Sequence, residues 1–550
     1  MSAATDTREP QLGWNTRRRW VAPRPPAAQT AAELRHRLLG PLDRWRDWPR
    51  LERTLYWAIP LACAIVAGVL RFVNLGTPHS LIFDETYYVK DAYSYLHFGY
   101  EKNWSDNANP LFIAGNFSAI QSSPEYVVHP PLGKWMIALG MWLFGPSSSF
   151  GWRFSSALFG TLSVALVAWA AYKLFRSPVL AATAGLLLAV DGHHITMSRI
   201  GILDIFLSFW LLAAFCALLK DREDGRRRLA TRLAASALPN GRIPATALAA
   251  GPWLGVRWWR IAAGVCIGCA VGVKWSGLAY VLAFGLLTVL WDASARRTAG
   301  IRAWLPAAVV RDAPLAFVSI VVVGGAVYLS TWTGWFLSSD AYFRHWAEAN
   351  PDPTWSWVPA SLRSLAHYHL EAYAFHTGLT ETHPYAASPW SWLVQGRPTS
   401  FYYVEPSGCG ADRCSSAILS VGNPLIWWAG TIALAVAVLL WAGRRDWRVG
   451  GALCGVAAGY LPWFMYPERT MFAFYEVSFE PFFILVLAYV LGHILGRPTD
   501  PPWRRQAGFL GVGVYLVLVV IVSAYFMPIW SAQTITYLDW RMHMWMPSWV

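Results

Sequence analysis

Long apolar segments separated by polar stretches run through most of the chain. The first covers residues 55–75, and ten more follow it. A helix needs about 20 mostly apolar residues to cross the hydrocarbon core of a bilayer. The pattern therefore predicts an all-α polytopic membrane protein with about eleven transmembrane helices, several of them short for a span. The later segments lie at about 154–175, 178–195, 200–219, 258–273, 277–291, 314–335, 424–443, 447–463, 476–495 and 508–530.

Composition supports this class, and the placement of charge sets the orientation of the chain. Hydrophobic residues make up 55% of the 550 residues, more than a soluble chain can hide. The net charge of +13 does not indicate a nucleic-acid partner, because the cations lie where cytoplasmic loops are expected. Alternation from a cytoplasmic N-terminus puts the C-terminus outside. Eleven arginines precede the first apolar segment, and others cluster at 226–228, 296–297, 444–445 and 504–505.

The same pattern divides the chain into a tail and one membrane domain. Residues 1–53 have no apolar period, and we expect a basic, mostly disordered cytoplasmic tail. The segment 55–75 lacks the short apolar core and small-residue cleavage site of a signal peptide, so it is interpreted as an anchor. Residues 54–550 form the membrane domain, whose long polar stretches 76–153 and 336–423 fall outside.

A short amphipathic helix is predicted at the acid pair Asp84 and Glu85, because Tyr88 and Tyr95 follow at helical spacing. Asp84 has two interpretations at this point. It is either an N-cap, with Glu85 complementing the helix dipole, or a carboxylate held at the membrane interface as a general base. Further along the loop, residues 135–144 are too short to span the bilayer and should lie on its outer surface or form a partial hairpin.

Charged side chains at membrane depth are costly and mark candidate functional positions. Asp191 lies at the outer end of the third apolar segment, and Arg199 and Asp204 lie at the start of the fourth. Either Arg199 pairs with Asp204 and locks two helices, or its planar guanidinium holds a phosphate. Lys274, between two short spans, and Arg153, at the outer end of its span, either snorkel to the interface or contact the same phosphate.

His129 and Lys134 flank a Pro-Pro turn in the first outer loop. We expect His129 to be a hydrogen-bonded structural residue and Arg469 to snorkel. Taken together, one acid pair and several cations gather at the outer leaflet beneath aromatic-rich loops. This arrangement favours a phosphate-bearing lipid donor, an acid–base step and an extended acceptor over a solute pathway at the bilayer midplane.

Cys409 and Cys414 are the only two cysteines in the predicted outer loops, and they flank a Gly-containing turn in an oxidising compartment. We therefore expect them to form a disulfide, and we expect the five cysteines within spans to be reduced packing residues. No Cys-x-x-Cys pairs with a second one, which excludes the usual cysteine metal framework. A divalent ion on Asp84, Glu85 and Asp204 has no supporting spacing, so no metal or other cofactor is predicted.

Several motifs carry a family resemblance. The first outer loop reads Phe-Asp-Glu-Thr-Tyr-Tyr and then His-Pro-Pro-Leu-Gly-Lys-Trp. Gly-Trp-Arg-Phe, Ser-Arg-Ile-Gly-Ile-Leu-Asp, Gly-Val-Lys-Trp-Ser-Gly-Leu and His-Pro-Tyr-Ala-Ala-Ser-Pro-Trp-Ser-Trp follow in order. The series resembles that of the protein O-mannosyltransferases, glycosyltransferase family 39, which have the GT-C fold. Residues 336–423 are too few for the β-trefoil domain of eukaryotic members. The chain is therefore similar to the bacterial form, and its abundant Arg, Ala and Trp with few Lys suggest an actinobacterial source.

The resemblance implies inverting transfer of one mannose from a polyprenyl-phosphate-mannose donor to Ser or Thr of secreted proteins. It places the active site on the outer face of the plasma membrane and makes the secretion translocon a candidate partner. Asp84 is then the base and Glu85 orients the acceptor. Lys274 binds the donor phosphate, with Arg199 and Arg153 as further candidates. His129, Lys134, Asp191 and Asp204 are supporting residues.

Two other functions compete with this interpretation. The first is another lipid-linked GT-C enzyme, moving aminoarabinose to lipid A or arabinose to a cell-wall glycan. The His-Pro-Pro-Leu-Gly-Lys and Pro-Tyr-Ala-Ala-Ser-Pro-Trp runs argue against it. A transporter for a lipid-linked sugar should show internal repeats and paired discontinuous helices, which the sequence does not show.

Overall fold

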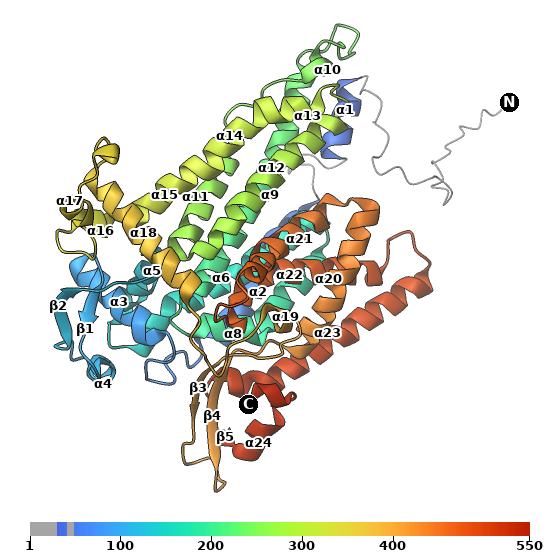
Figure 1. The fold of residues 1–550 in the computed structure, drawn as a ribbon. Coiled ribbons are helices and arrows are strands. Elements are labelled where there is room, and N and C mark those ends of the chain that lie inside the picture. The colour runs from blue at the N-terminus through green and yellow to red at the C-terminus, as the bar shows by residue number, and fades with distance from the viewer. Residues whose placement is uncertain (1–29, 41–48) are drawn as a thin grey trace.

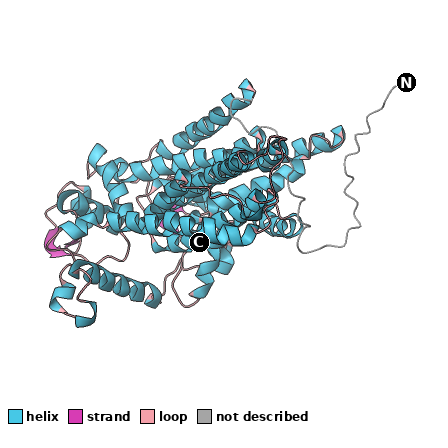
Figure 2. Cartoon of the chain, turned by 90° about the horizontal axis from the view of Figure 1, so that it is seen from above, coloured by secondary structure: helices cyan, strands magenta, loops and turns pink. Residues whose placement is uncertain are grey.

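Helices build nearly all of the protein (Figures 1 and 2). The computed structural model describes residues 30–40 and 49–550. Within these ranges, six helices are long and apolar enough to cross a membrane, or seven if one bent pair counts as a single span. The six are α2 (Arg50–Phe72), α6 (Ser149–Phe175), α12 (Leu278–Thr298) with the turn before it, the continuous run Trp304–Thr331, α20 (Pro424–Arg444) and α23 (Pro502–Trp530).

The other apolar segments are shorter, more polar or broken helices, so all eleven predicted segments are largely helical. The run Trp304–Thr331 contains α13 (Trp304–Ala307), α14 (Ala313–Phe317) and α15 (Val323–Thr331), joined by π-helical turns. The remaining elements are α7 (Pro178–Val190), α8 (Gly192–Arg199), α9 (Asp204–Ala234), α11 (Trp258–Val273), α21 (Trp447–Tyr460), α22 (Glu480–Leu495) and the 3₁₀ segments η2 (Trp275–Gly277), η6 (Leu461–Met465) and η7 (Ala473–Ser478).

The predicted continuous segment 178–195 is bent by 57° between α7 and α8. Asp191 ends α7 and caps α8, since its carboxylate accepts from the backbone N–H groups of His193 and His194. A side-chain cap of this kind satisfies the free amides that begin a helix, and it favours a new start over continuation. Gly192 at the bend lies against the Trp530 ring, because an added Cβ would sit 1.9 Å from that ring.

The first outer loop is folded rather than extended. It contains α3 (Glu85–Phe98), β1 (Lys102–Trp104), α4 (Ala108–Ile113), β2 (Ile120–Pro124) and α5 (Leu132–Phe144). β1 and β2 pair antiparallel, with Lys102 opposite Pro124 and Trp104 opposite Ile120. The short apolar helix α5 packs on α3 and α6. It contains residues 135–144, the segment predicted to be too short to span the bilayer.

The second long loop contains one long helix, several short ones and two strands of a small sheet in order β3-β4-β5. Within the described residues this region has too few strands for a β-trefoil, as predicted. The disulfide joins Cys409 to Cys414 beside the turn between β3 and β4. The elements are α16 (Thr333–Leu337), α17 (Trp346–Ala349), α18 (Ala360–Gly378), α19 (Pro389–Trp392), β3 (Ser400–Val404), β4 (Cys414–Leu419) and, near the C-terminus, β5 (Ile535–Thr536) and α24 (Tyr537–Met542).

Part of the predicted disordered tail is a helix, α1 (Ala31–Leu39). Thr30 caps it, and Leu34 and Leu38 are buried in a cluster with residues of α9. Burial of these two leucines explains why this stretch folds although its neighbours have no apolar period. The rest of the tail prediction falls mainly on residues 1–29 and 41–48, which lie outside the described part of the chain.

Candidate active site

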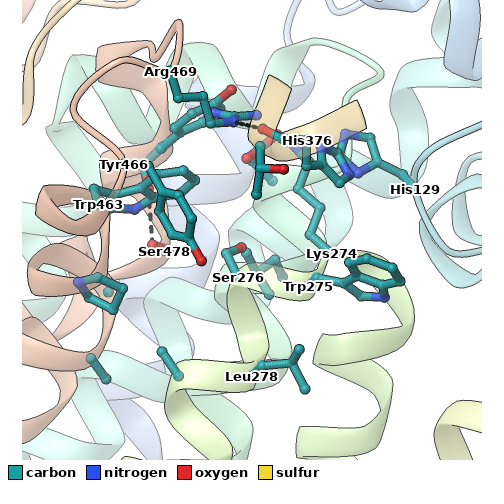
Figure 3. A pocket seen from close by; sticks show the side chains of 18 of the residues that line it. His129, Lys274, Trp275, Ser276, Leu278, His376, Trp463, Tyr466, Arg469 and Ser478 are labelled. Atoms are coloured by element: carbon teal, nitrogen blue, oxygen red, sulfur yellow. Dashed lines mark hydrogen bonds and ion pairs between the residues drawn. The ribbon is translucent and has the colours of Figure 1, made fainter. Parts of the chain in front are cut away.

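A cavity of about 280 Å³ lies between the ends of the membrane helices and the second of the two long loops that were predicted to lie outside. Figure 3 shows Lys274, His129 and His376 on one side of it and Trp463 and Tyr466 on the other, with Arg469 above. Apolar residues of the membrane helices continue the wall below these polar groups. They are Leu207, Leu278, Ala279, Ala458 and Pro462. The cavity is thus polar at one end and suited to a lipid chain at the other.

Lys274 is placed in this wall by the end of a helix. It follows the last turn of α11, where its extended backbone breaks the helix before η2. Its Nζ lies 2.7 Å from Oδ2 of Asp204 and within 6 Å of the Phe474 and Tyr475 rings. Asp204 therefore pairs with Lys274, and not with Arg199 as one sequence interpretation had it. The ammonium faces the cavity with a second N–H available to an anion.

Asp84 is the N-terminal neighbour of α3, but its side chain makes no capping hydrogen bond. The capping interpretation of this residue is thereby corrected. Its carboxylate instead interacts with the Tyr88 hydroxyl and with the charges of Lys274 and Asp204. Burial raises the pKa of Asp84 from its usual 3.8 to about 6, while Lys274 and Tyr88 act in the opposite direction. A carboxylate with this pKa suits a general base near neutral pH.

An unusual backbone conformation presents Asp84. Phe83 has φ = 48°, in the left-handed region that a bulky residue rarely adopts. Its ring is held edge-on by Phe401, Phe472 and Phe474, at centroid distances of 4.9, 6.1 and 5.7 Å. These contacts from two distant segments stabilise the turn and so fix where the carboxylate points.

Glu85 does not face the cavity, so the structure corrects its predicted role in orienting the acceptor. Its carboxylate is fully buried and accepts from Nε and Nη2 of Arg153 at 2.8 and 2.9 Å. The backbone N–H groups of Ile82 and Gly201 fill its remaining positions. Arg153 also donates to three carbonyls of residues 75–80, so it has no group left for a phosphate. The pair clamps the first outer loop onto α6.

Arg199 and Asp191 likewise hold the backbone. Arg199 donates to the carbonyl oxygens of residues 70, 71, 73 and 74, which end α2, and this corrects its assignment to the donor phosphate. Asp191 caps α8 and accepts from Asn423 N at 2.9 Å and Trp427 Nε1 at 3.2 Å. Both residues position helices around the site and do not line the cavity.

Of the two residues flanking the Pro-Pro turn, His129 lines the cavity and Lys134 does not. The ring of His129 lies 5.1 Å from that of His376 and 6.0 Å from that of Tyr88. Burial lowers the pKa of His129 well below its usual range, so the imidazole is neutral. Lys134 is buried and pairs with Glu101 while donating to the His129 carbonyl. It therefore supports the turn that places His129.

Arg469 and His376 are the cavity residues that sequence reasoning undervalued or missed. Arg469 donates from Nε to the His376 carbonyl at 2.8 Å and lies over the Trp463 and Tyr475 rings. These contacts hold the Arg469 guanidinium as a second cation, besides Lys274, in the lining of the cavity. The Tyr-Pro-Glu-Arg run signalled an interfacial arginine, but no local pattern could show that residue 469 meets α18.

Three buried groups outside the cavity wall lie close enough together to consider a metal. Ligand atoms of Asp191, His193 and Glu480 lie within 4.8 Å of one another. However, His193 Nδ1 is 2.8 Å from Glu480 Oε2, and Asp191 is occupied by the contacts given above. These hydrogen bonds engage Asp191, one ring nitrogen of His193 and one oxygen of Glu480, while His193 Nε2 and Glu480 Oε1 have no partner among the described residues. The carboxylates considered in the sequence are also engaged, Glu85 by Arg153 and Asp204 by Lys274.

Comparison with known proteins identifies the family. Residues 61–239 match the family described as dolichyl-phosphate-mannose-protein mannosyltransferase, and residues 361–549 match the C-terminal four-transmembrane region of protein O-mannosyltransferase. A Mycolicibacterium smegmatis protein named polyprenol-phosphate-mannose–protein mannosyltransferase is 38% identical over 530 residues, covering 93% of this chain and 96% of that protein. A Mycobacterium tuberculosis protein of the same name is 38% identical over 528 residues, covering 93% and 95%.

The fold agrees with these matches. The Saccharomyces cerevisiae protein O-mannosyltransferase Pmt1-Pmt2 complex, solved with its sugar donor, aligns with a TM-score of 0.69 at 16% identity and covers 95% of each chain. The described chain is a multi-pass, mostly helical protein with the GT-C fold. On sequence and fold together, it belongs to the protein O-mannosyltransferase family.

Proposed function

We propose that this protein transfers one mannose from a polyprenyl-phosphate-mannose donor to Ser or Thr hydroxyls of secreted proteins. The observation that carries the proposal is the raised pKa of the Asp84 carboxylate, which interacts with the charge of Lys274, a residue lining a cavity that is polar at one end and apolar at the other. The relatives named above transfer mannose from such a lipid to protein. Their donor combines a sugar, a phosphate and an isoprenoid chain, which are the three chemistries that the cavity walls offer.

The reaction that fits this geometry is a single displacement with inversion. The acceptor oxygen attacks C1 of the mannose while Asp84 takes the hydroxyl proton. The bond from C1 to the phosphate oxygen breaks, and its electron pair leaves with the phosphate. Asp204, the neighbouring carboxylate, is held by Lys274, so no second free carboxylate is placed for a covalent intermediate.

Charge stabilisation and positioning supply the rest of the barrier reduction. As the glycosidic bond breaks, the phosphate gains negative charge at a depth where little water competes. Lys274 and Arg469 are the cations of the cavity wall that face it. General-base help is worth about 10²–10⁴-fold, so preorganised charge and orientation contribute the larger part. We also infer that transfer needs no divalent ion, because a lysine and an arginine stand where the phosphate charge develops.

The proposed setting is the outer face of the plasma membrane, with the N-terminus cytoplasmic and the C-terminus outside. The arginine clusters of the sequence support this orientation by the positive-inside rule. Acceptors would then meet the site as extended chains leaving the secretion translocon, beneath the aromatic second outer loop. The translocon is part of the proposal as the source of unfolded acceptor segments.

Reconstitution of the purified full chain tests the function. It is given a defined polyprenyl-phosphate-mannose, a Ser/Thr-rich peptide and a matched peptide with Ala and Val in place of Ser and Thr. We expect one hexose on hydroxyl residues of the first peptide and none on the second, with inverted anomeric configuration by NMR. Chelator should leave the rate unchanged. Sugar transfer to a glycolipid acceptor but not to the peptide would overturn the assignment.

A further inference from the structure

A second cavity, of about 560 Å³, lies far from the active site. The helix α9 connects the two, with Asp204 at the active site and Arg222 in the second cavity. Eighteen residues of α-helix span about 27 Å, close to the thickness of the hydrocarbon core. The second cavity therefore opens at the opposite membrane surface, where Figure 1 shows α1 beside α9 and α12.

Its wall is strongly basic. Seven cationic side chains line it against two carboxylates, and four helical segments contribute them. The carboxylates are already engaged. Glu223 lies 2.6 Å from Lys173 and 3.4 Å from Arg176, and Asp446 pairs with Arg448 at 2.6 Å. The other cations of the wall are Arg222, Arg226, Arg227 and Arg444.

Arg222 and Arg226 are the most informative of these cations, because neighbouring groups of the protein do little to balance their buried positive charge. Both lie on one face of α9, one turn apart. The guanidinium carbon of Arg222 stacks 3.3 Å from the centre of the Trp447 ring. The Nε atoms of Arg222 and Arg226 are buried without a hydrogen-bond partner among the described residues. Arg226 donates from Nη1 to the Leu38 carbonyl.

Arg222 and Arg226 differ from the arginines that merely mark the cytoplasmic side of a membrane protein. A topological arginine extends into water, whereas stacking on Trp447 fixes the plane of Arg222 and leaves the edge of its guanidinium toward the cavity. Fixed guanidinium groups in a concave site are the usual means of binding phosphate oxygens. The wall also contains the apolar residues Leu38, Leu39, Leu174 and Leu219.

We propose that this cavity binds the phosphate headgroup of an anionic membrane phospholipid. Free phosphate compounds share the headgroup chemistry, but leucines next to the arginines match the first carbons of acyl chains. Basic pockets between transmembrane helices at one membrane surface are suited to such headgroups. The excess of cations over carboxylates favours a headgroup with two phosphates, as in cardiolipin. Helices α1, α6, α9 and α21 meet here, so the bound lipid would hold α1 on the membrane domain.

Native mass spectrometry of the purified full chain in detergent tests the proposal. Cardiolipin and phosphatidylcholine are titrated against wild type, Arg222→Gln, Arg226→Gln and the double variant. Arg505→Gln is the matched control, because it removes an exposed arginine of a predicted cytoplasmic cluster outside this cavity. We expect wild type to prefer cardiolipin. Each cavity variant should weaken its binding roughly fivefold, by about 1 kcal/mol per arginine, and the control should not.

Three results decide the matter. Equal cardiolipin affinity of wild type and the double variant would overturn the site. Arg226→Gln decides alone if Arg222→Gln fails to fold, since the hydrogen bond that Arg226 makes to another described residue is the one to the Leu38 carbonyl. In a parallel arm, inorganic phosphate that binds in an Arg226-dependent way and displaces cardiolipin completely would overturn the lipid assignment in favour of a soluble phosphate compound. Because the readout is binding, failure here leaves the proposed mannosyl transfer untouched.

Discussion

Asp84 directly precedes α3, at the N-cap position, but its side chain makes no capping hydrogen bond, and this leaves the carboxylate available for chemistry. A capping aspartate would be engaged by the amides of the first turn, which would lower its pKa and its basicity. Here the left-handed Phe83 turns the side chain toward Lys274 and Tyr88 instead. A backbone conformation rare for phenylalanine is thus connected to the reactivity of the next residue.

We predict that Asp84→Asn abolishes transfer and preserves the fold. The change is isosteric and removes the proton acceptor, so the rate should fall by about 10²–10⁴-fold at saturating acceptor. Because folding raises the pKa of this carboxyl, the native site disfavours its charge, and the neutral amide should not lower Tm at pH 7. Turnover and Tm of the purified variant are measured beside Asp106→Asn, an exposed aspartate of the same loop. Wild-type turnover in Asp84→Asn would end the assignment of the base.

The pH dependence should follow the same carboxyl group. Only ionised Asp84 accepts a proton, and its pKa is about 6. The kcat/KM of the wild type should therefore be level above pH 7 and fall with decreasing pH below about 6, approaching tenfold per pH unit. Residual activity of Asp84→Asn should show no such step. A wild-type profile that is flat from pH 5 to pH 8 contradicts this prediction.

Lys274 is predicted to bind the donor phosphate. Because the phosphate gains charge as it leaves, a cation there stabilises the transition state more than the ground state. Lys274→Ala should lower turnover by about 10²-fold or more, the usual effect of removing one stabilising group from such a site. Lys274→Arg should retain part of the activity, since it keeps the charge and an ion pair to Asp204. Donor affinity and single-turnover rate are measured for both. If Lys274→Ala changes neither, Arg469 becomes the candidate phosphate ligand.

At the scale of elements, one buried ion pair joins the first outer loop to the membrane helices. Arg153, near the start of α6, and Glu85, in the first turn of α3, have no exposed surface, and Arg153 donates two hydrogen bonds to the Glu85 carboxylate. Glu85 also accepts from Gly201 N at 2.7 Å, ahead of α9. The Glu85 carboxylate, next to Asp84 in the chain, therefore fixes the relative positions of α3, α6 and the segment before α9.

We predict that Glu85→Gln loses both stability and activity, in contrast to Asp84→Asn. Removing one charge leaves Arg153 buried without its counter-ion, which typically costs about 3–5 kcal/mol. Tm should fall, and turnover should fall with it because Asp84 is no longer held in place. The comparison is made by thermal unfolding of both variants in the same detergent. A Glu85→Gln protein with wild-type Tm and low turnover would instead place Glu85 in contact with the acceptor.

The local sequence predicted elements better than it predicted contacts between them. The acid pair, the helix after it and the position of Lys274 in a turn between two apolar segments follow from spacing and polarity. The partners of Arg153 and Arg199 do not, since each residue bonds to backbone more than 70 positions away along the chain. An arginine that caps a distant helix and one that binds phosphate have the same local sequence. Only the tertiary fold separates them.

At the scale of the whole molecule, hydropathy predicted the helical segments but not the polar contacts within them. Arg257 and Arg260, at the start of α11, form ion pairs with Asp221 of α9 and Asp292 of α12. These residues look like loop charges or snorkelling residues along the sequence. Buried together, they set the register of three helices at the membrane surface opposite the active site, as a closed network satisfies charges that would each be costly alone.

The last prediction concerns the orientation of that molecule in the membrane. Arginine clusters lie at one surface, and the cavity lined by Lys274 and Asp204 lies at the other end of α9, so a single orientation follows if the clusters are cytoplasmic. Trp357, 76% exposed in the second outer loop, should then face outward, and Arg505, before α23, inward. A single cysteine is added at one of these positions, in a background in which the disulfide cysteines Cys409 and Cys414 are replaced by serine, and the cells are treated with an impermeant maleimide. Residue 357 should react in intact cells, and residue 505 only after lysis. Labelling of residue 505 in intact cells would reverse the orientation and put the proposed transfer in the wrong compartment for secreted acceptors.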